Sequence, residues 1–548
     1  MPDPLSKLKF YDKEDRPWPS NRLTSSAIVG HVTTTTARIW VRVHKPGTYC
    51  LIVSETEIDS KLRPAVSPAG KVMLREGQLR PQPFRGQSHC KKLDYSTDLT
   101  SVFWIRKLNA GKRYYYALFD CADRDEPWEI GRDYPHCFRT APSRSENVTI
   151  GLYSCHMPFK GKNVLNMNMW QSFMELLEDT DADFTIGCGD QVYTDGDKRL
   201  SIWAWLKSHK DEMLALSDDE QQDVMLSWYR DIYRGYWGDE WLRKVFRNYP
   251  SYMIWDDHEI MDGWGSYTQK ELSQELDTIW EWENEKQNLR LANNMFEAAK
   301  KAYGEYQHSH NPDTDENQWD YSFSWSQLAC FVFDMRGHRR YDRRPGRSKI
   351  LGDDQWDRFE NWLKKPQTIN SPAVLIVSPV PVVHVSSFIT NTLDLPALGI
   401  ADDLRDEWEH HSNRDGRKRL LKNVFDFSQR YKKPVLFLSG DVHLGAAFKL
   451  QREGMTNAKV FQLTSSAITY AKSPGKLLKL VVRNRGTIDV GANNPRTSFE
   501  RLHLFEDNNF GLIHVRKKPR KPAEIMWDLY GSSGEEDQVI RLKRVRLA

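Results

Sequence analysis

Four apolar runs along this chain each end in a short polar motif, and this pattern restricts the fold more than any other feature. The runs have the composition of buried strands, and their motifs are SCH (154–156), GDQVY (189–193), WDDHE (255–259) and SGDVH (439–443). In layered folds of strands and helices, polar residues just beyond the strand ends meet in one crevice. We therefore predict a single site rich in oxygen, nitrogen and sulfur ligands, and interpret it as a metal-dependent hydrolytic site. Its predicted members are Cys155, Asp190, Tyr193, Asp257, His258, Asp441 and His443.

The order of strand and helix signals divides the chain into two parts. A length of 548 residues exceeds what one ordinary core holds, so two domains or one large domain with insertions are expected. Residues 1–144 are β-rich, with alternating runs such as ARIWVRVH (37–44), and predict a small β-sandwich domain. In residues 145–548 strands alternate with helices, which predicts an α/β catalytic domain, and residues 268–310 are expected to form a helical excursion.

The composition bounds the partners and the compartment. A net charge of +3 is nearly balanced and argues neither for nor against nucleic acid as a dominant partner. No stable nucleic-acid complex is expected. No window approaches ~18 consecutive apolar residues, so no membrane-spanning helix is expected. The start of the chain lacks the apolar region of a secretory signal, which favours the cytoplasm; a removed leader would instead indicate a periplasmic or secreted protein. Seven irregularly spaced cysteines do not predict a disulfide framework.

The GDQVY and SCH motifs carry the first part of the metal hypothesis. A carboxylate at Asp190, in the turn that Gly189 permits, is able to bridge two ions, and Tyr193 lies three residues further on, within reach of the same ion. Asp after Gly is also a common turn residue, and a buried Cys such as Cys155 is usually a small apolar side chain, so both plain alternatives stay open. A thiolate beside a phenolate would favour ferric iron over magnesium.

The WDDHE and SGDVH motifs add a candidate acid and further ligands. Three ionisable side chains directly after an apolar strand are costly unless they are paired or bound to metal, although a salt-bridged loop is an alternative. His258 beside Asp257 suits a general acid, and Asp262 is a candidate hydrogen-bonding partner. Asp441 and His443 point the same way if the backbone stays extended, but a hydrogen-bonded His at a strand end is equally common.

The run FDMRGHRR (333–340) supplies positive charge at another strand end. Arg336, Arg339 and Arg340 are able to pair bidentately with phosphate oxygens. For each arginine taken singly, a solvated basic loop is the alternative.

Taken together, the motifs resemble those of a known family. SCH, GDQVY, WDDHE, FDMRGHR, LGDDQWDRFENWL and SGDVH resemble, in order and spacing, the alkaline phosphatase D (PhoD-like) family of calcineurin-like metallophosphoesterases. The N-terminal SSAIVGHVTTTTARIWVRV and the closing FRTAP are similar to that family's small sandwich domain, so the resemblance covers nearly the whole chain. It implies an α/β core of two stacked mixed sheets flanked by helices, instead of the single parallel sheet that strand alternation alone suggests.

The resemblance also implies roles for individual residues. By position, Asp190 would bridge two metals, with Cys155 and Tyr193 completing an iron site, and the implied cofactors are Fe³⁺ and Ca²⁺, other divalent metals being possible. The implied catalytic residues are His258, Asp190 and Arg336; the further metal ligands are Asp257, Asp441 and His443; and the substrate-binding residues are Arg336, Arg339, Asp406 and Trp408. The family's D-x-W-x-G-Y stretch keeps its Asp and Trp here, but His410 and His411 replace Gly-Tyr, so the rim around the substrate differs.

The predicted function is hydrolysis of a small-molecule phosphate ester, a monoester or a diester, by a metal-activated hydroxide at a binuclear centre. The alternative from a different class is a catalytically degenerate module that binds a phosphorylated ligand or a protein partner without turnover.

Overall fold

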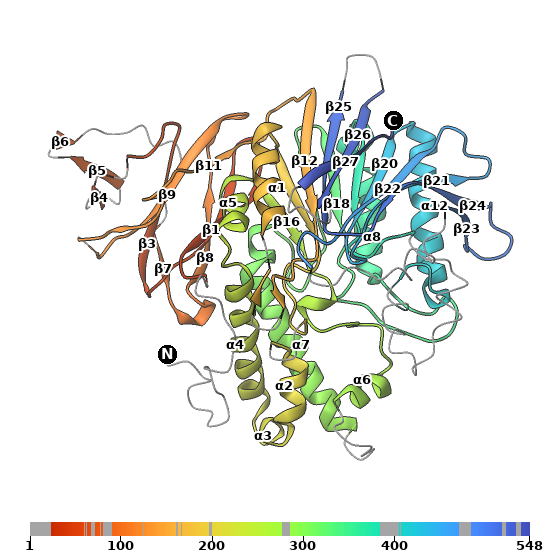
Figure 1. The fold of residues 1–548 in the computed structure, drawn as a ribbon, viewed down its shortest axis with the longest axis horizontal. Helices are drawn as coiled ribbons and strands as arrows, with labels where there is room; N and C mark the ends of the chain where they lie inside the picture. Colours follow the sequence, from red (N-terminus) through yellow and green to blue (C-terminus); the bar gives the residue numbers. More distant parts are fainter. Residues whose placement is uncertain are drawn as a thin grey trace.

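The N-terminal part contains antiparallel sheets, which confirms the predicted β-rich region (Figure 1). The computed structural model describes residues 23–59, 61, 63–66, 72–76, 78–79, 90–123, 125–160, 163–165, 167–196, 200–276, 285–383, 405, 407–470, 484–517, 522–532 and 539–548. One sheet has the order β1 (Ser26–Val32), β2 (Ala37–Arg42) and β8 (Thr100–Ile105). A larger sheet has the order β10 (Trp128–Ile130), β9 (Arg113–Asp120), β3 (Gly47–Ser54) and β7 (Cys90–Leu93), and β11 (His136–Arg139) also pairs with β9. A small sheet contains β4 (Arg63–Val66), β5 (Val72–Glu76) and β6 (Gln78–Leu79).

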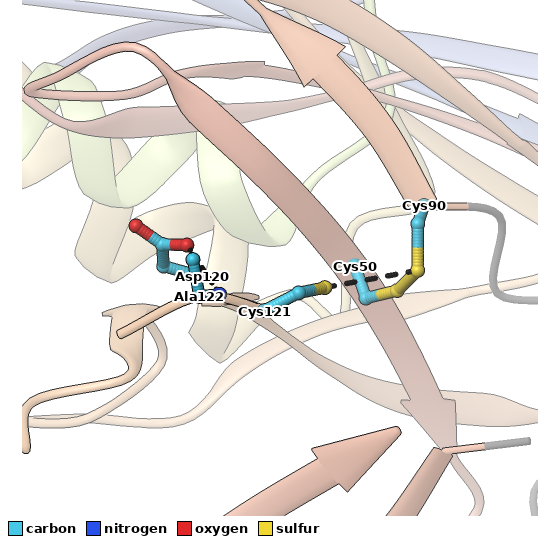
Figure 2. The surroundings of a disulfide bond; sticks show 5 residues. All are labelled: Cys50, Cys90, Asp120, Cys121 and Ala122. Carbon is cyan, nitrogen blue, oxygen red and sulfur yellow. Dashed lines mark hydrogen bonds between the residues drawn. A yellow bond between two sulfur atoms is a disulfide. The ribbon is translucent and has the colours of Figure 1, made fainter. Parts of the chain in front are cut away.

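One disulfide joins two strands of the larger N-terminal sheet (Figure 2). Cys50 in β3 is bonded to Cys90 in β7, and the sulfur of Cys121 lies 3.7 Å from that of Cys90. The other five cysteines are free. A single bridge is not the framework of a disulfide-dense domain. The irregular spacing of the cysteines did not predict the pair Cys50–Cys90.

Two mixed sheets form the centre of the remaining chain, in agreement with the predicted α/β core. The six-stranded sheet has the order β16 (Ser251–Ile254), β15 (Phe184–Cys188), β12 (Asn147–Tyr153), β25 (Asn509–Arg516), β26 (Glu524–Ser532) and β27 (Val539–Arg546). The eight-stranded sheet has the order β17 (Tyr321–Trp325), β18 (Leu328–Val332), β19 (Val374–Val377), β20 (Pro434–Ser439), β22 (Lys459–Ser465), β21 (Gly445–Arg452), β24 (Thr497–Phe505) and β23 (Arg485–Ile488). The apolar run AVLIVSPVPVV predicts one strand over 373–383, but β19 ends at Val377.

The side chains of β20 show how the layers are held together. Leu436 and Leu438 are buried in the core that also contains the apolar side chains of β12, whereas Val435 and Phe437 are buried in a second core beside helices α8 and α12. Successive residues of a strand face opposite sides, so the eight-stranded sheet is covered on both faces. This explains why β20 is apolar throughout, as is usual for a parallel strand inside an α/β core.

The helices flank these sheets and extend below them in Figure 1. Helices α4 and α6 each begin with a capping box, formed by Ser217 with Glu220 and by Thr268 with Glu271. In the described part of the chain, no helix is long and apolar enough to cross a membrane. The helix bounds are α1 (Asn168–Asp179), α2 (Ile202–Ser208), α3 (Lys210–Leu214), α4 (Asp218–Tyr236), α5 (Glu240–Asn248), α6 (Gln269–Glu275), α7 (Glu285–Tyr306), α8 (Asp353–Lys364), α9 (Pro366–Asn370) and α12 (Arg414–Tyr431).

The chain changes from the N-terminal sheets to the central ones between Arg139, the end of β11, and Asn147, the start of β12. We propose that the domain boundary at 144/145 lies in this connection. The predicted excursion, 268–310, contains α6 and α7, and we propose that it belongs to the second domain, 145–548.

The two central sheets meet at the carboxyl ends of their parallel strands. A Cβ atom at Gly440, just after β20, would lie 2.2 Å from the hydroxyl oxygen of Ser154, just after β12. Only glycine permits this approach. The amide of Ile468, which follows β22 of the eight-stranded sheet, donates a hydrogen bond of 2.9 Å to the carbonyl oxygen of Ser154 and so also links the two sheets. The residues that follow the parallel strands of both sheets are thereby brought to one place.

Candidate metal centre

Four aspartates converge where the two sheets meet. One carboxylate oxygen from each of Asp190, Asp256, Asp257 and Asp441 lies within 4.8 Å of the others. Asp190 follows β15, Asp256 and Asp257 follow β16, and Asp441 follows β20. Burial, together with neighbouring carboxylates, raises the pKa of Asp190 and of Asp441 well above the usual range. A cluster of this kind is costly unless cations compensate its charge.

Thiol, phenol and imidazole groups lie on one side of Asp190. Its Oδ2 atom is 3.2 Å from the sulfur of Cys155 and 3.4 Å from the hydroxyl oxygen of Tyr193. That hydroxyl is also 3.0 Å from Nε2 of His443. Burial raises the pKa values of Cys155 and Tyr193 well above their usual range and lowers that of His443 to about 3. The thiol and the phenol are therefore protonated when no cation is bound, and each would have to release its proton to bind one.

The backbone at four of these residues is strained. Cys155, Asp190, Asp441 and His443 have φ values of 55°, 55°, 69° and 52°, in the left-handed region that side-chain-bearing residues seldom adopt. Such conformations persist only where the surrounding structure imposes them, and they cluster at functional sites. Asp441 and His443 were expected to point the same way from an extended backbone. The backbone is not extended there, because β20 ends at Ser439 and both residues have positive φ values.

His258 lies at the edge of the cluster and is held by a carboxylate. Its Nδ1 atom is 2.7 Å from Oδ1 of Asp195, and its ring packs at a tilt against that of Tyr193, with 4.1 Å between the centroids. Burial works against the imidazolium, but the charges of Asp195 and Asp257 outweigh it and raise the pKa of His258 well above its usual value. Asp262, the predicted partner, donates its backbone amide to Asp195 and so supports this pair indirectly.

Arg336 is fully buried behind the aspartates. Its Nε atom pairs with Asp256, its Nη2 atom lies 3.3 Å from Oδ1 of Asp257, and its Nη1 atom donates a hydrogen bond of 2.9 Å to the carbonyl oxygen of Trp264. The structure thus places the predicted phosphate-binding arginine in contact with the carboxylates.

The predicted rim residues lie in different settings. Arg339 is half-buried and donates from Nη2 to the carbonyl oxygen of Arg405. Trp408 is 0% exposed and donates from its indole to the hydroxyl of Ser378, so it lies in the core beneath the rim. Arg340 is exposed and pairs through its backbone with Lys349. Asp406 lies outside the described residues.

Three contributors to the site were not singled out from the sequence. Asp256 stands inside WDDHE and Asp195 two residues after GDQVY, but nothing in the sequence shows which acid faces a histidine or an arginine. Glu259 accepts hydrogen bonds from the amides of Asp190, Gln191 and Asp256, and burial raises its pKa to about 8. Its fourth partner is Gln307, after α7, so the helical excursion also supports the centre.

The donors fit cations. The Oδ1 atom of Asp190 is buried and lacks a hydrogen-bond donor within the described chain, as expected of a carboxylate whose partner is an ion. Carboxylate oxygens suit hard cations such as Ca²⁺, whereas the thiol and imidazole on the other side of Asp190 suit a transition metal.

Comparison with known proteins agrees with this geometry. A sequence model of the PhoD-like phosphatases matches residues 151–521. The chain belongs to this family. The resemblance noted in the motifs is thereby confirmed, and membership supports phosphoester hydrolysis as the general class of reaction.

Two similar proteins extend the comparison. A solved structure of PhoD aligns with a TM-score of 0.62 over 97% of this chain and 93% of that one, at 13% identity, and shows that the fold is shared. The uncharacterized protein YGR266W of Saccharomyces cerevisiae is 22% identical in an alignment 384 positions long, which covers 57% of this chain. The match spans about half of the yeast protein, 52% of its length.

Proposed function

We propose that this protein hydrolyses phosphate esters at a binuclear metal centre in the Asp190 cluster. The observation that carries the proposal is the convergence of four aspartates, three of them buried, with Cys155, Tyr193 and His443 at the joined strand ends. Asp190 contributes to both groups, as a bridging ligand must. On this proposal, Cys155, Tyr193 and His443 hold ferric iron, and Asp257 and Asp441 hold Ca²⁺ or another divalent ion.

The chain's own residues account for the remaining requirements of the reaction. Bound cations would lower the pKa of a water molecule and stabilise the negative charge of an in-line phosphoryl transfer. His258, with Nδ1 held by Asp195, directs its other nitrogen away from that carboxylate and would donate a proton to the leaving oxygen. Arg336 would fix Asp256 and Asp257, and Arg339 is our candidate for contact with the substrate phosphate.

Replacing Asp195 is expected to move the pH dependence of the reaction. The carboxylate raises the pKa of His258, so Asp195→Asn lowers that pKa and the acid form is lost at a lower pH. The alkaline limb of the kcat profile should therefore shift towards acid, with a loss of about 10–100-fold at alkaline pH, typical for a residue that orients a catalytic group. Asp353→Asn, at an exposed acid, is the control and should leave the profile unchanged. An unmoved alkaline limb in the Asp195 variant would contradict the acid role of His258.

The kind of ester is settled by comparing 4-nitrophenyl phosphate with bis(4-nitrophenyl) phosphate on protein whose metal content has been measured. Turnover of either ester by metal-containing protein, lost on chelation and restored by metal, is the expected result. Metal-free protein that binds phosphate esters without cleaving them would instead support the degenerate binding module.

The iron assignment predicts a coloured protein. A phenolate coordinated to ferric iron gives a visible charge-transfer band, and Tyr193 supplies the phenol, 3.4 Å from Asp190. Tyr193→Phe should remove the band, whereas Tyr470→Phe, at a ring that stacks on His443 with 3.7 Å between the centroids, should retain it. A colourless wild-type protein with only zinc or manganese would contradict the iron assignment and leave hydrolysis possible.

We further propose a small-molecule phosphate ester as the partner.

A further inference from the structure

A cluster of arginine side chains lies outside the carboxylate centre, where helix α5 meets the N-terminal sheets. Figure 1 shows α5 beside β1 and β11. A cavity of about 70 Å³ lies at this junction. Its walls come from both parts of the chain and include Ser26, Arg132, Tyr134, His136, Arg243 and Arg247.

Arg247 is buried in this wall without a counter-ion. Its residue is 5% exposed, its Nε atom has no hydrogen-bonding partner, and within the described chain no carboxylate forms an ion pair with its guanidinium. Burying an arginine without a counter-ion is costly because its charge and the buried part of its N–H donors lose their contacts with water. Buried arginines are ordinarily paired.

The protein groups around Arg247 compensate its charge only in part. The guanidinium carbon lies 3.5 Å from the centroid of the Tyr134 ring, and Arg247 is in the last turn of α5, where the helix dipole favours a cation. Neither interaction supplies acceptors for its N–H groups. The ring of Tyr134 also stacks on that of His136, with 5.2 Å between the centroids.

The other charges of the wall leave the cavity positive. Arg243, one turn before Arg247, donates from Nε to the carbonyl oxygen of Asp239 and adds a second cation. Burial lowers the pKa of His136 to about 3, so its imidazole is neutral. Of the two acids in the wall, Glu129 is already bonded to His44, at 2.6 Å, and Asp133 is exposed to solvent.

We propose that this cavity binds a compact tetrahedral oxyanion, held by Arg247 and Arg243. The ligand would be free phosphate or sulfate, or the terminal phosphoryl group of a larger molecule, since all three present the same oxygens to an arginine fork. The cavity exceeds the roughly 10–15 Å³ that one water needs, so it has room for such an anion. The site does not depend on the proposed hydrolytic function.

The bound anion would fasten the N-terminal sheets to the helix that leads into β16. The carbonyl oxygen of Arg247 already accepts a hydrogen bond of 2.8 Å from the hydroxyl of Tyr116 in β9, and Asn248 accepts one from the amide of Cys137 in β11. Helix α5 ends at Asn248 and β16 begins at Ser251. An anion at Arg247 would add a charged contact to this junction.

The test is the thermal unfolding midpoint of the purified, metal-containing protein, with and without orthophosphate. Orthophosphate should raise the midpoint of the wild type, because a ligand that binds only the folded state stabilises it. In phosphate-free buffer, Arg247→Met should unfold at the same or a higher temperature, since an unpaired buried charge has been removed. Asp190→Asn should remove the part of the midpoint shift that comes from phosphate bound at the metal centre. The shift that remains in Asp190→Asn should come from the cavity, and adding Arg247→Met to this variant should abolish it.

Two further variants control the result. Arg243→Gln, at a half-buried position, should fold and show a reduced phosphate shift. Lys244→Gln removes the same charge from the same helix, but Lys244 pairs with Glu240 at 2.9 Å and does not line the cavity, so its shift should be unchanged. An undiminished phosphate shift in Arg247→Met would overturn the proposal. If Arg247→Met fails to fold, an undiminished shift in Arg243→Gln would overturn it.

The source of the anion is distinguished by the ligand series. A midpoint shift that depends on Arg247 with orthophosphate and sulfate, but not with phenylphosphonate, would identify a free anion. An Arg247-dependent midpoint shift that is larger with phenylphosphonate than with orthophosphate or sulfate would identify the phosphoryl group of a larger ligand. No Arg247-dependent shift with any of the three would refute the site.

Discussion

Asp190→Asn is expected to lower phosphoesterase activity by at least about 100-fold and to lower the bound metal content. Losing even an outer hydrogen-bonding partner of a metal ligand costs about 10–100-fold, and Asp190 is the residue that both groups of donors share. Asparagine keeps the shape but has one oxygen fewer, so it is unable to bridge two ions through two oxygens.

The same substitution should not destabilise the metal-free protein. Burial raises the folded-state pKa of Asp190, so its ionised form opposes folding at neutral pH, above the unfolded-state pKa. Asparagine removes that charge, and chelator-treated variant protein should unfold at the same or a higher urea concentration than the wild type. Activity, metal content by elemental analysis and urea midpoint are the three measurements.

Asp183→Asn is the matched control. Asp183 is also buried and burial also raises its pKa, but it bonds to the amide of Thr149 and to Arg139, outside the aspartate cluster. This variant should keep its metal and its activity. Wild-type-like turnover and metal content in Asp190→Asn would rule out the proposed centre.

The sequence predicted the elements whose signal is local. The apolar runs before Cys155, Asp190 and Asp257 correspond to β12, β15 and β16, and the helical excursion expected over 268–310 contains α6 and α7. These runs are apolar because both faces of a parallel strand are buried, so a fold that joins the strand ends follows from them.

The sequence did not predict features set by tertiary contact. The backbone at Asp441 and His443 takes positive φ values, which side-chain alternation along a strand does not reveal. The pairing of His258 with Asp195 joins residues 63 positions apart, and a run of acids does not indicate which one makes the contact. Arg336 was expected at the substrate, whereas its burial against Asp256 depends on the approach of two loops from different sheets.

Arg336→Met is expected to lower the free energy of unfolding of the metal-free protein by about 3–5 kcal/mol, the usual result of removing one partner from a buried ion pair. The side chain is 0% exposed and pairs with Asp256 and Asp257, so methionine leaves both carboxylates without their cation. Bound metal would partly compensate those carboxylates, so the loss should be smaller in metal-loaded protein. Urea denaturation of both forms measures the difference.

This stability loss separates two roles for Arg336. An arginine that only binds the substrate phosphate would, when replaced, lower activity and leave the urea midpoint unchanged. If the arginine fixes the aspartates, replacing it would lower both the activity and the urea midpoint. Arg336→Lys would then restore part of the stability because the charge is kept. The recovery would be incomplete because one ammonium group does not reach both Asp257 and Trp264. Arg344→Met removes an exposed arginine paired with Asp342 and should change neither property. We expect the second pattern, which makes Arg336 a positioning residue and leaves Arg339 as the arginine that meets the substrate.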